Sequence, residues 1–191
     1  MIDFFKNFGA SAKEFKSLKS LVAAALLVAV HTVLAFFLSI QVTPSLRISL
    51  SFLANVVIGA MFGPVMGFVC GGVGDLVQFI IKPQGAFFPG WTLNAALACM
   101  IYGMFFYNKY PAKAFDWKYW LRCIIVLILE TFFVNIFLGT LWCTVMYGKG
   151  FWFYFSSRFI KNMIQLPINI IMTYYILWFA KKLKLKEHLK Q

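Results

Sequence analysis

Long apolar runs, separated by short polar connections, constrain the fold of this chain more than any other feature of the sequence. A helix needs about 20 apolar residues to cross the hydrocarbon core of a membrane. Against that length, the 191-residue sequence predicts an all-α integral membrane protein with six transmembrane helices in one compact bundle. The predicted spans are 18–40, 48–62, 64–81, 92–107, 119–143 and 157–180.

The composition supports this fold class and excludes a soluble one. Hydrophobic residues make up 62% of the chain and charged residues only 13%. A soluble domain is about 45–50% apolar and about one quarter charged. A soluble fold of this length could not bury so much apolar surface and still keep a wettable exterior, so we expect a multi-pass protein surrounded by lipid.

Polarity divides the chain into three parts. Residues 1–17 form an amphipathic, lysine-bearing segment, which is expected to lie on the inner membrane surface. Residues 18–182 form the six-helix transmembrane domain, and residues 183–191 form a basic cytoplasmic tail. Gly63 and Pro64 separate the second predicted span from the third, and Pro83, Gly85 and Pro89 break the chain before the fourth.

The distribution of Lys and Arg predicts that both termini are cytoplasmic, because basic residues concentrate in cytoplasmic loops. Most of them lie near the N-terminus, in the 107–122 connection or in the C-terminal tail: Lys6, Lys13, Lys16, Lys19, Lys109, Lys113, Lys118, Arg122, Lys181, Lys182, Lys184, Lys186 and Lys190. The others are Arg47, Lys82, Lys149, Arg158 and Lys161. Topology thus accounts for the net charge of +12, and no nucleic-acid partner is predicted.

Polar residues recur at helical spacing near the outer ends of several predicted spans. One stripe is Asp75, Gln78 and Lys82; a second is Arg158, Asn162, Gln165 and Asn169, with Lys161 beside it; Thr131 and Asn135 share a face, and Asn94 opens the fourth span. Polar side chains inside a membrane face the bundle interior or a wet cavity, because unpaired burial costs several kcal/mol. The stripes predict a polar cavity that opens outward, the alternative being hydrogen bonding between helices without a ligand.

The sequence gives no support for catalysis or for a metal site. It lacks the phosphate-binding, zinc-protease and serine-hydrolase motifs GxxxxGK[ST], HExxH and GxSxG. Its cysteines are far apart and form no CxxC pair. Asp75 and Glu130 are the acids well inside the spans, and each is either functional or part of a structural ion pair. We expect His31 to be a satisfied residue of the bundle.

Three ordered motifs carry a resemblance to a known family. They are TPSLRISLSFL from Thr43, GAMFGPVMG from Gly59 and GGVGDLVQFIIKPQGAFFPGWTLNA from Gly71, followed by Tyr102 and Gly103. In this order and spacing, they resemble the folate family of substrate-binding S components of energy-coupling factor (ECF) transporters. The family often has Phe at the position of Trp91, which indicates a pocket adjusted for a related vitamin.

The resemblance implies a vitamin-capture subunit that binds folate or a reduced folate at an outward-facing pocket. It also implies partners: a transmembrane scaffold subunit and two ABC ATPases, which use ATP, reorient the subunit and deliver the vitamin inside. This chain would bind no cofactor of its own. Ala25 and Ala29, an AxxxA pair on the first helix, would contact the scaffold. The location implied is the prokaryotic plasma membrane.

The chemistry of folate suggests a role for each candidate residue. An anionic glutamate tail favours cations, and a flat pterin favours aromatic stacking and hydrogen bonds. The candidates are Arg47, Lys82, Arg158 and Lys161 for the carboxylates, Phe88 and Trp91 for stacking, and Asp75, Asn94, Asn135 and Gln165 for the pterin edge. The alternatives are an S component for a riboflavin-like or B6-like vitamin and a membrane assembly protein without a transport role.

Overall fold

The structure is a computed structural model. It describes residues 2–43, 46–83, 86–111, 115–148 and 150–182, and it describes the side chains of all of these except residues 2–6 and 39–49. The elements in chain order are α1 (Ile2–Glu14), α2 (Leu18–Phe37), β1 (Ser39–Thr43), β2 (Leu46–Ser49), α3 (Phe52–Ile81), α4 (Pro89–Phe106), α5 (Trp117–Glu130), the π-helix η1 (Thr131–Leu138), α6 (Gly139–Tyr147) and α7 (Phe151–Lys182). The predicted tail at 183–191 lies outside the described residues.

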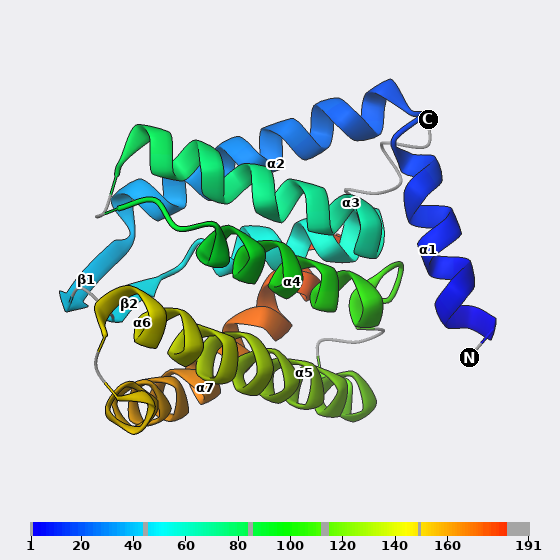
Figure 1. The fold of residues 1–191 in the computed structure, drawn as a ribbon. Coiled ribbons are helices and arrows are strands. Elements are labelled where there is room, and N and C mark those ends of the chain that lie inside the picture. Colours follow the sequence, from blue (N-terminus) through cyan, green and yellow to red (C-terminus); the bar gives the residue numbers. More distant parts are fainter. Residues whose placement is uncertain (1, 44–45, 84–85, 112–114, 149, 183–191) are drawn as a thin grey trace.

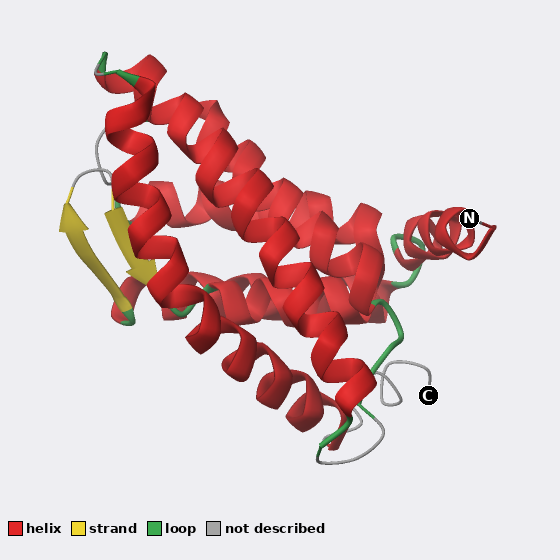
Figure 2. Cartoon of the chain, turned by 90° about the horizontal axis from the view of Figure 1, so that it is seen from below, coloured by secondary structure: helices red, strands yellow, loops and turns green. Residues whose placement is uncertain are grey.

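The helices pack in two groups (Figure 1). Helices α2, α3 and α4 form one group, and the continuous stretch α5–η1–α6 packs with α7 in the other. Helix α1 and the C-terminal end of α7 lie at one end of the molecule, and the β1–β2 hairpin lies at the opposite end (Figures 1 and 2). This arrangement places Lys13 of α1 and Lys181 and Lys182 of α7 at the same end.

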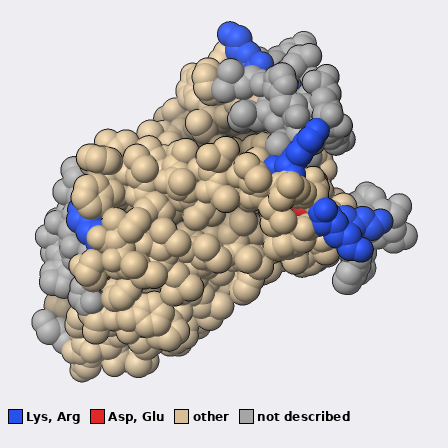
Figure 3. Space-filling view, turned by 90° about the horizontal axis from the view of Figure 1, so that it is seen from above, with Lys and Arg blue, Asp and Glu red and all other residues tan. Residues whose placement is uncertain are grey.

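Within the described residues, four helical stretches are long and apolar enough to cross a membrane: Leu18–Phe37, Phe52–Ile81, Trp117–Tyr147 and Phe151–Lys182. The face in Figure 3 agrees with this, since apolar and uncharged atoms cover its middle and Lys and Arg gather at its two ends. The predicted spans 48–62 and 64–81 correspond to the two helical segments that meet at Gly63 within α3, and the predicted span 92–107 corresponds to the shorter α4.

The expected break at Gly63 and Pro64 is present as a kink inside α3. Gly63 has a φ of 84°, which L side chains rarely adopt, so only glycine fits this turn without strain. Pro64 begins the second half of α3, where a missing backbone N–H costs nothing. Ser11 of α1 caps that half from outside: its Oγ accepts hydrogen bonds from the backbone N–H groups of Val65 (3.1 Å) and Met66 (3.2 Å).

Helices α3 and α4 pack more closely than any other described pair because glycines line their contact. A Cβ added to Gly71 would lie 2.7 Å from the carbonyl oxygen of Ala95, and one added to Gly103 would lie 2.5 Å from the Gly63 carbonyl carbon. Small residues such as Gly67, Gly71 and Gly74 let a neighbouring helix approach closely. The neighbour of Gly67 and Gly71 is α4, whereas Gly74 faces His31 of α2.

A short antiparallel hairpin lies between α2 and α3, where the sequence analysis predicted helical residues at 39–40 and 48–49. Strand β1 pairs with β2 in the register Ser39 with Ser49, Ile40 with Ile48 and Gln41 with Arg47. The β-branched residues of the segments SIQVT and LRIS favour strands, and each segment is too short to cross a membrane as a helix. The helical architecture is therefore supplemented by one hairpin at the end opposite the termini.

Candidate functional site

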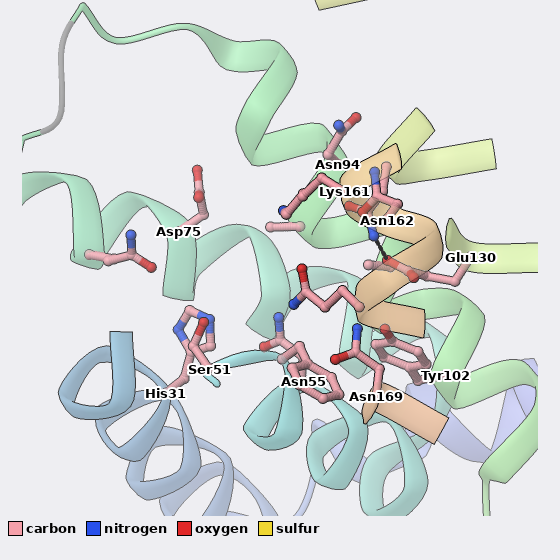
Figure 4. A pocket seen from close by; sticks show the side chains of 16 residues that line it. His31, Ser51, Asn55, Asp75, Asn94, Tyr102, Glu130, Lys161, Asn162 and Asn169 are labelled. Carbon is pink, nitrogen blue, oxygen red and sulfur yellow. Dashed lines mark hydrogen bonds between the residues drawn. The ribbon is translucent and has the colours of Figure 1, made fainter. Parts of the chain in front are cut away.

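A polar cavity of about 240 Å³ lies between the two groups of helices (Figure 4). Helices α2, α3, α4 and α7 and the α5–η1 junction all contribute side chains to it. Its described lining is His31, Ser51, Phe52, Asn55, Asp75, Gln78, Asn94, Ala95, Ala98, Tyr102, Glu130, Asn135, Lys161, Asn162, Gln165 and Asn169. Most of these groups donate or accept hydrogen bonds, so the cavity suits a ligand with many polar edges.

One wall of the cavity is formed by α2 and α3. His31 and Asn55 are buried there, and Asp75 is half-buried. Thr92 of α4 donates a hydrogen bond of 2.8 Å from its hydroxyl to the Asp75 carboxylate. This contact fixes one carboxylate oxygen of Asp75 against α4, beside the cavity.

The opposite wall is formed by η1 and α7. Asn135 donates a hydrogen bond of 3.0 Å from its side-chain amide to the carboxylate of buried Glu130. Lys161 and Asn162 of α7 lie on the same side of the cavity as Glu130 in Figure 4. The Oε1 atom of Gln165 is buried and has no hydrogen-bond partner among the described residues. This wall therefore offers a cation, three side-chain amides and a carboxylate within one small volume.

Five predicted site residues meet at this cavity although they are far apart in the sequence. Asp75, Asn94, Asn135, Lys161 and Gln165 all line it. Asn94 is held firmly, because it donates to the Val134 carbonyl (3.3 Å) and accepts from the Trp142 indole (2.9 Å). The polar stripes of the sequence thus converge on one place.

The other predicted site residues are not among the described lining residues. Lys82 donates to the carbonyl of Phe36 (3.4 Å) and lies over the ring of that residue at the end of α3. Phe88 packs its ring on Trp142 with 5.5 Å between centroids. Arg47 lies in β2, and its side chain is outside the described part of the structure.

Trp91 and Arg158 contact each other close to the cavity. The Arg158 guanidinium lies 5.0 Å from the centre of the Trp91 ring. The Trp91 indole donates to the sulfur of Met146 (3.3 Å), and Arg158 donates to the carbonyl of Asn135 (3.2 Å). In this structure both side chains therefore contact protein groups behind the cavity wall.

Several lining residues were not candidates from the sequence. Gln78, Asn162 and Asn169 lie on the predicted stripes, so their spacing could have identified them. Ser51 and Asn55 are four residues apart, so their spacing could also have identified them, whereas His31 and Tyr102 belong to largely apolar segments that give little periodic signal. Glu130 was left between a structural and a functional role, and it lines the cavity.

The predicted docking residues Ala25 and Ala29 are exposed and line a second, apolar groove of about 390 Å³. The rest of its described lining is Phe15, Leu21, Ala24, Val28, Met66, Val69, Cys70, Val73 and Val77. The four cysteines are buried as free thiols, and no cluster of metal-ligating residues occurs within the described ranges. The polar cavity is therefore the candidate site for a small polar molecule.

A bundle of apolar helices around a polar cavity defines a multi-pass membrane protein with an internal site. The particular family follows from comparison: the family model described as "ECF transporter, substrate-specific component" matches residues 19–177. The chain belongs to this family. It is therefore a substrate-binding component of a transporter and not an enzyme.

Individual relatives agree with the family. The folate transporter FolT of Clostridium novyi (strain NT) is 34% identical over 159 residues, covering 83% of this chain and 88% of the relative. The folate transporter FolT of Streptococcus mutans is 32% identical over 144 residues, covering 73% and 75%. A crystal structure of FolT bound with folic acid superposes with a TM-score of 0.73 at 37% identity, covering 83% of this chain and 93% of that one.

Proposed function

We propose that this protein captures folate or a reduced folate at the polar cavity and delivers it across the cell membrane as the S component of an ECF importer. The observation that carries the proposal is the convergence of Asp75, Asn94, Asn135, Lys161 and Gln165 on one cavity. Relatives named as folate transporters, and a similar structure that holds folic acid, support the choice of ligand.

The chemistry of the cavity matches the two ends of folate. The pterin ring carries adjacent donors and acceptors, which the amides of Asn94, Asn135 and Gln165 and the carboxylate of Asp75 can pair. The glutamate tail carries carboxylates, and Lys161 supplies the positive charge for them. The buried, unpartnered oxygen of Gln165 favours a ligand that donates a hydrogen bond there.

The partners and topology belong to the same proposal. One scaffold subunit would dock on the groove at Ala25 and Ala29, and two ABC ATPases would supply energy from ATP. Six spans with both termini in the cytoplasm fit the positive-inside rule and the location of α1 and the end of α7 at one end of the molecule. The small residues of the groove let a partner helix approach closely, which supports its role as a docking face.

The test is equilibrium binding of folic acid to the detergent-purified protein, followed by intrinsic tryptophan fluorescence. Trp142 is hydrogen-bonded to a cavity residue, so a bound pterin should quench its emission. We expect saturable quenching by folic acid and none by riboflavin or pyridoxine at the same concentration. Binding of riboflavin or pyridoxine alone would reassign the vitamin, and no binding at all would favour a membrane assembly role.

A matched pair of variants localises the site. Lys161→Gln removes the cavity cation, so we expect the folic acid Kd to rise at least about tenfold, which is about 1.4 kcal/mol. Lys182→Gln removes an exposed lysine near the ring of Trp178 at the far end of α7, and it should leave the Kd unchanged. Equal effects of the two changes would contradict binding at this cavity.

A further inference from the structure

The π-helix η1 shapes the wall of the cavity. In an α-helix, residues three or four apart share a face, whereas a π-helix closes its hydrogen bonds over five residues. Glu130 and Asn135 are five apart, and their side chains are joined by a hydrogen bond of 3.0 Å at the cavity. The π-helical turn is therefore what brings the carboxylate and the amide into one site.

Side chains from two other helices hold backbone carbonyls of η1. Asn94 of α4 donates to the carbonyl of Val134, and Arg158 of α7 donates through Nη1 to the carbonyl of Asn135. Through Nη2, Arg158 also donates to the Cys143 sulfur on α6 (3.2 Å). One guanidinium thus connects η1 and α6 to α7.

The surroundings of the Arg158 guanidinium match its shape closely. The residue is only 9% exposed, and its guanidinium lies over the Trp91 ring on one side. At Gly139, directly after η1, an added Cβ would lie 2.5 Å from Nη1 of Arg158. A planar group with several fixed donors fits such a slot, which a lysine ammonium cannot fill equally.

We propose that Arg158 is a positioning residue: it fixes the π-helical turn that presents Glu130 and Asn135 to the ligand, and it does not bind the ligand carboxylates itself. This differs from the role suggested by its charge in the sequence, and it rests on the proposed function for the identity of the ligand. Lys161 of the same helix lines the cavity, whereas Arg158 is not among the described lining residues.

Binding of two ligands distinguishes a residue that positions the cavity wall from one that binds the ligand carboxylates. Folic acid carries the two glutamate carboxylates, whereas pteroic acid keeps the pterin and has one benzoate carboxylate in their place. If Arg158 positions the wall at the pterin, Arg158→Ala should weaken both ligands by the same factor, at least about tenfold. Lys161→Gln should weaken folic acid at least about tenfold and pteroic acid by a clearly smaller factor. A loss confined to folic acid in Arg158→Ala, or no loss for either ligand, would overturn the proposal.

Milder variants keep the test valid if Arg158→Ala does not fold. Arg158→Lys keeps the charge but not the planar set of N–H donors, so its affinity for both ligands should fall by about the same factor. Gly139→Ala places a methyl group against the Arg158 guanidinium, so it should weaken both ligands by a similar factor without changing any charge. Gly9→Ala is the control, because an added Cβ there has nothing within 4 Å. Full rescue by Arg158→Lys together with an unaffected Gly139→Ala would refute positioning by the guanidinium.

A measurement without ligand distinguishes this proposal from the proposed function. Amide hydrogen exchange of the ligand-free protein should show faster exchange in 131–143 for Arg158→Lys and no change in 18–37. If the wild-type protein binds neither folic nor pteroic acid, the proposed function fails, and the exchange result still decides whether Arg158 holds η1. Unchanged exchange in 131–143 would overturn the positioning role whatever the ligand.

Discussion

Gly71 and Gly72 are neighbours on α3 but have different surroundings. A Cβ on Gly71 would meet the Ala95 carbonyl oxygen at 2.7 Å, whereas one on Gly72 would first meet the Ala96 Cβ at 3.7 Å. Gly71→Ala should therefore lower the free energy of unfolding by about 1–3 kcal/mol, the usual cost of overpacking. Gly72→Ala should be neutral or slightly stabilising, because alanine favours a helix. Thermal unfolding in detergent measures both, and equal midpoints would contradict the α3–α4 contact.

At the scale of single residues, the sequence predicted the polar half of the site better than the aromatic half. Asp75 and Gln165 follow from helical spacing near the ends of spans, and Asn94 from its place at the start of the fourth predicted span, because polar groups must face inward there. Phe88 and Trp91 lie at the start of α4, close to Asn94, but an aromatic ring can pack on protein or on ligand equally well. Only their contacts with Trp142, Met146 and Arg158 show that they pack on protein here.

At the scale of elements, Ser11 joins α1 to the kink in α3. Its hydroxyl donates to the Phe62 carbonyl (2.6 Å) and accepts from two N–H groups beyond the kink. Ser11→Ala leaves these backbone groups without their partner and should destabilise the protein by about 1–2 kcal/mol, as the loss of a helix cap does. Ser156→Ala is the matched control, since that exposed hydroxyl bonds only within its own helix, to the Trp152 carbonyl.

The measurement for this pair is again the thermal midpoint in detergent. Ser156→Ala should stay within about 0.5 kcal/mol of wild type. A Ser11→Ala protein as stable as Ser156→Ala would show that α1 is not fastened to α3 through this hydroxyl.

Two elements could not be predicted from the sequence, and the reasons are physical. The π-helix adds one residue to a turn without any change of composition, so the α-helical spacing paired Asn135 with Thr131. The structure instead joins Asn135 to Glu130. The β1–β2 hairpin lies beside long apolar runs, and its β-branched residues are equally common in membrane helices. Side chains from α4 and α7 hold the backbone of η1, and pairing between its own two strands holds the hairpin.

At the scale of the whole molecule, charge and shape favour the same orientation in the membrane. Helix α1 and the C-terminal end of α7 lie at one end of the molecule (Figure 1), and Lys13, Lys181 and Lys182 lie there with them. The α6–α7 connection, the hairpin and the α3–α4 connection lie at the opposite end. By the positive-inside rule, we therefore expect the end with α1 to face the cytoplasm and the α6–α7 connection to lie outside.

Cysteine labelling in intact cells tests this orientation. The native cysteines are buried, so the unmodified protein supplies the background. Lys13→Cys places a thiol on an exposed position of α1, and Gly150→Cys places one just before α7, where an added Cβ meets nothing within 4 Å. A membrane-impermeant maleimide should label Gly150→Cys in intact cells and Lys13→Cys only after permeabilisation. The opposite pattern would place the termini outside, and labelling of both variants in intact cells would mean that the two ends of the molecule do not lie on opposite sides of the membrane.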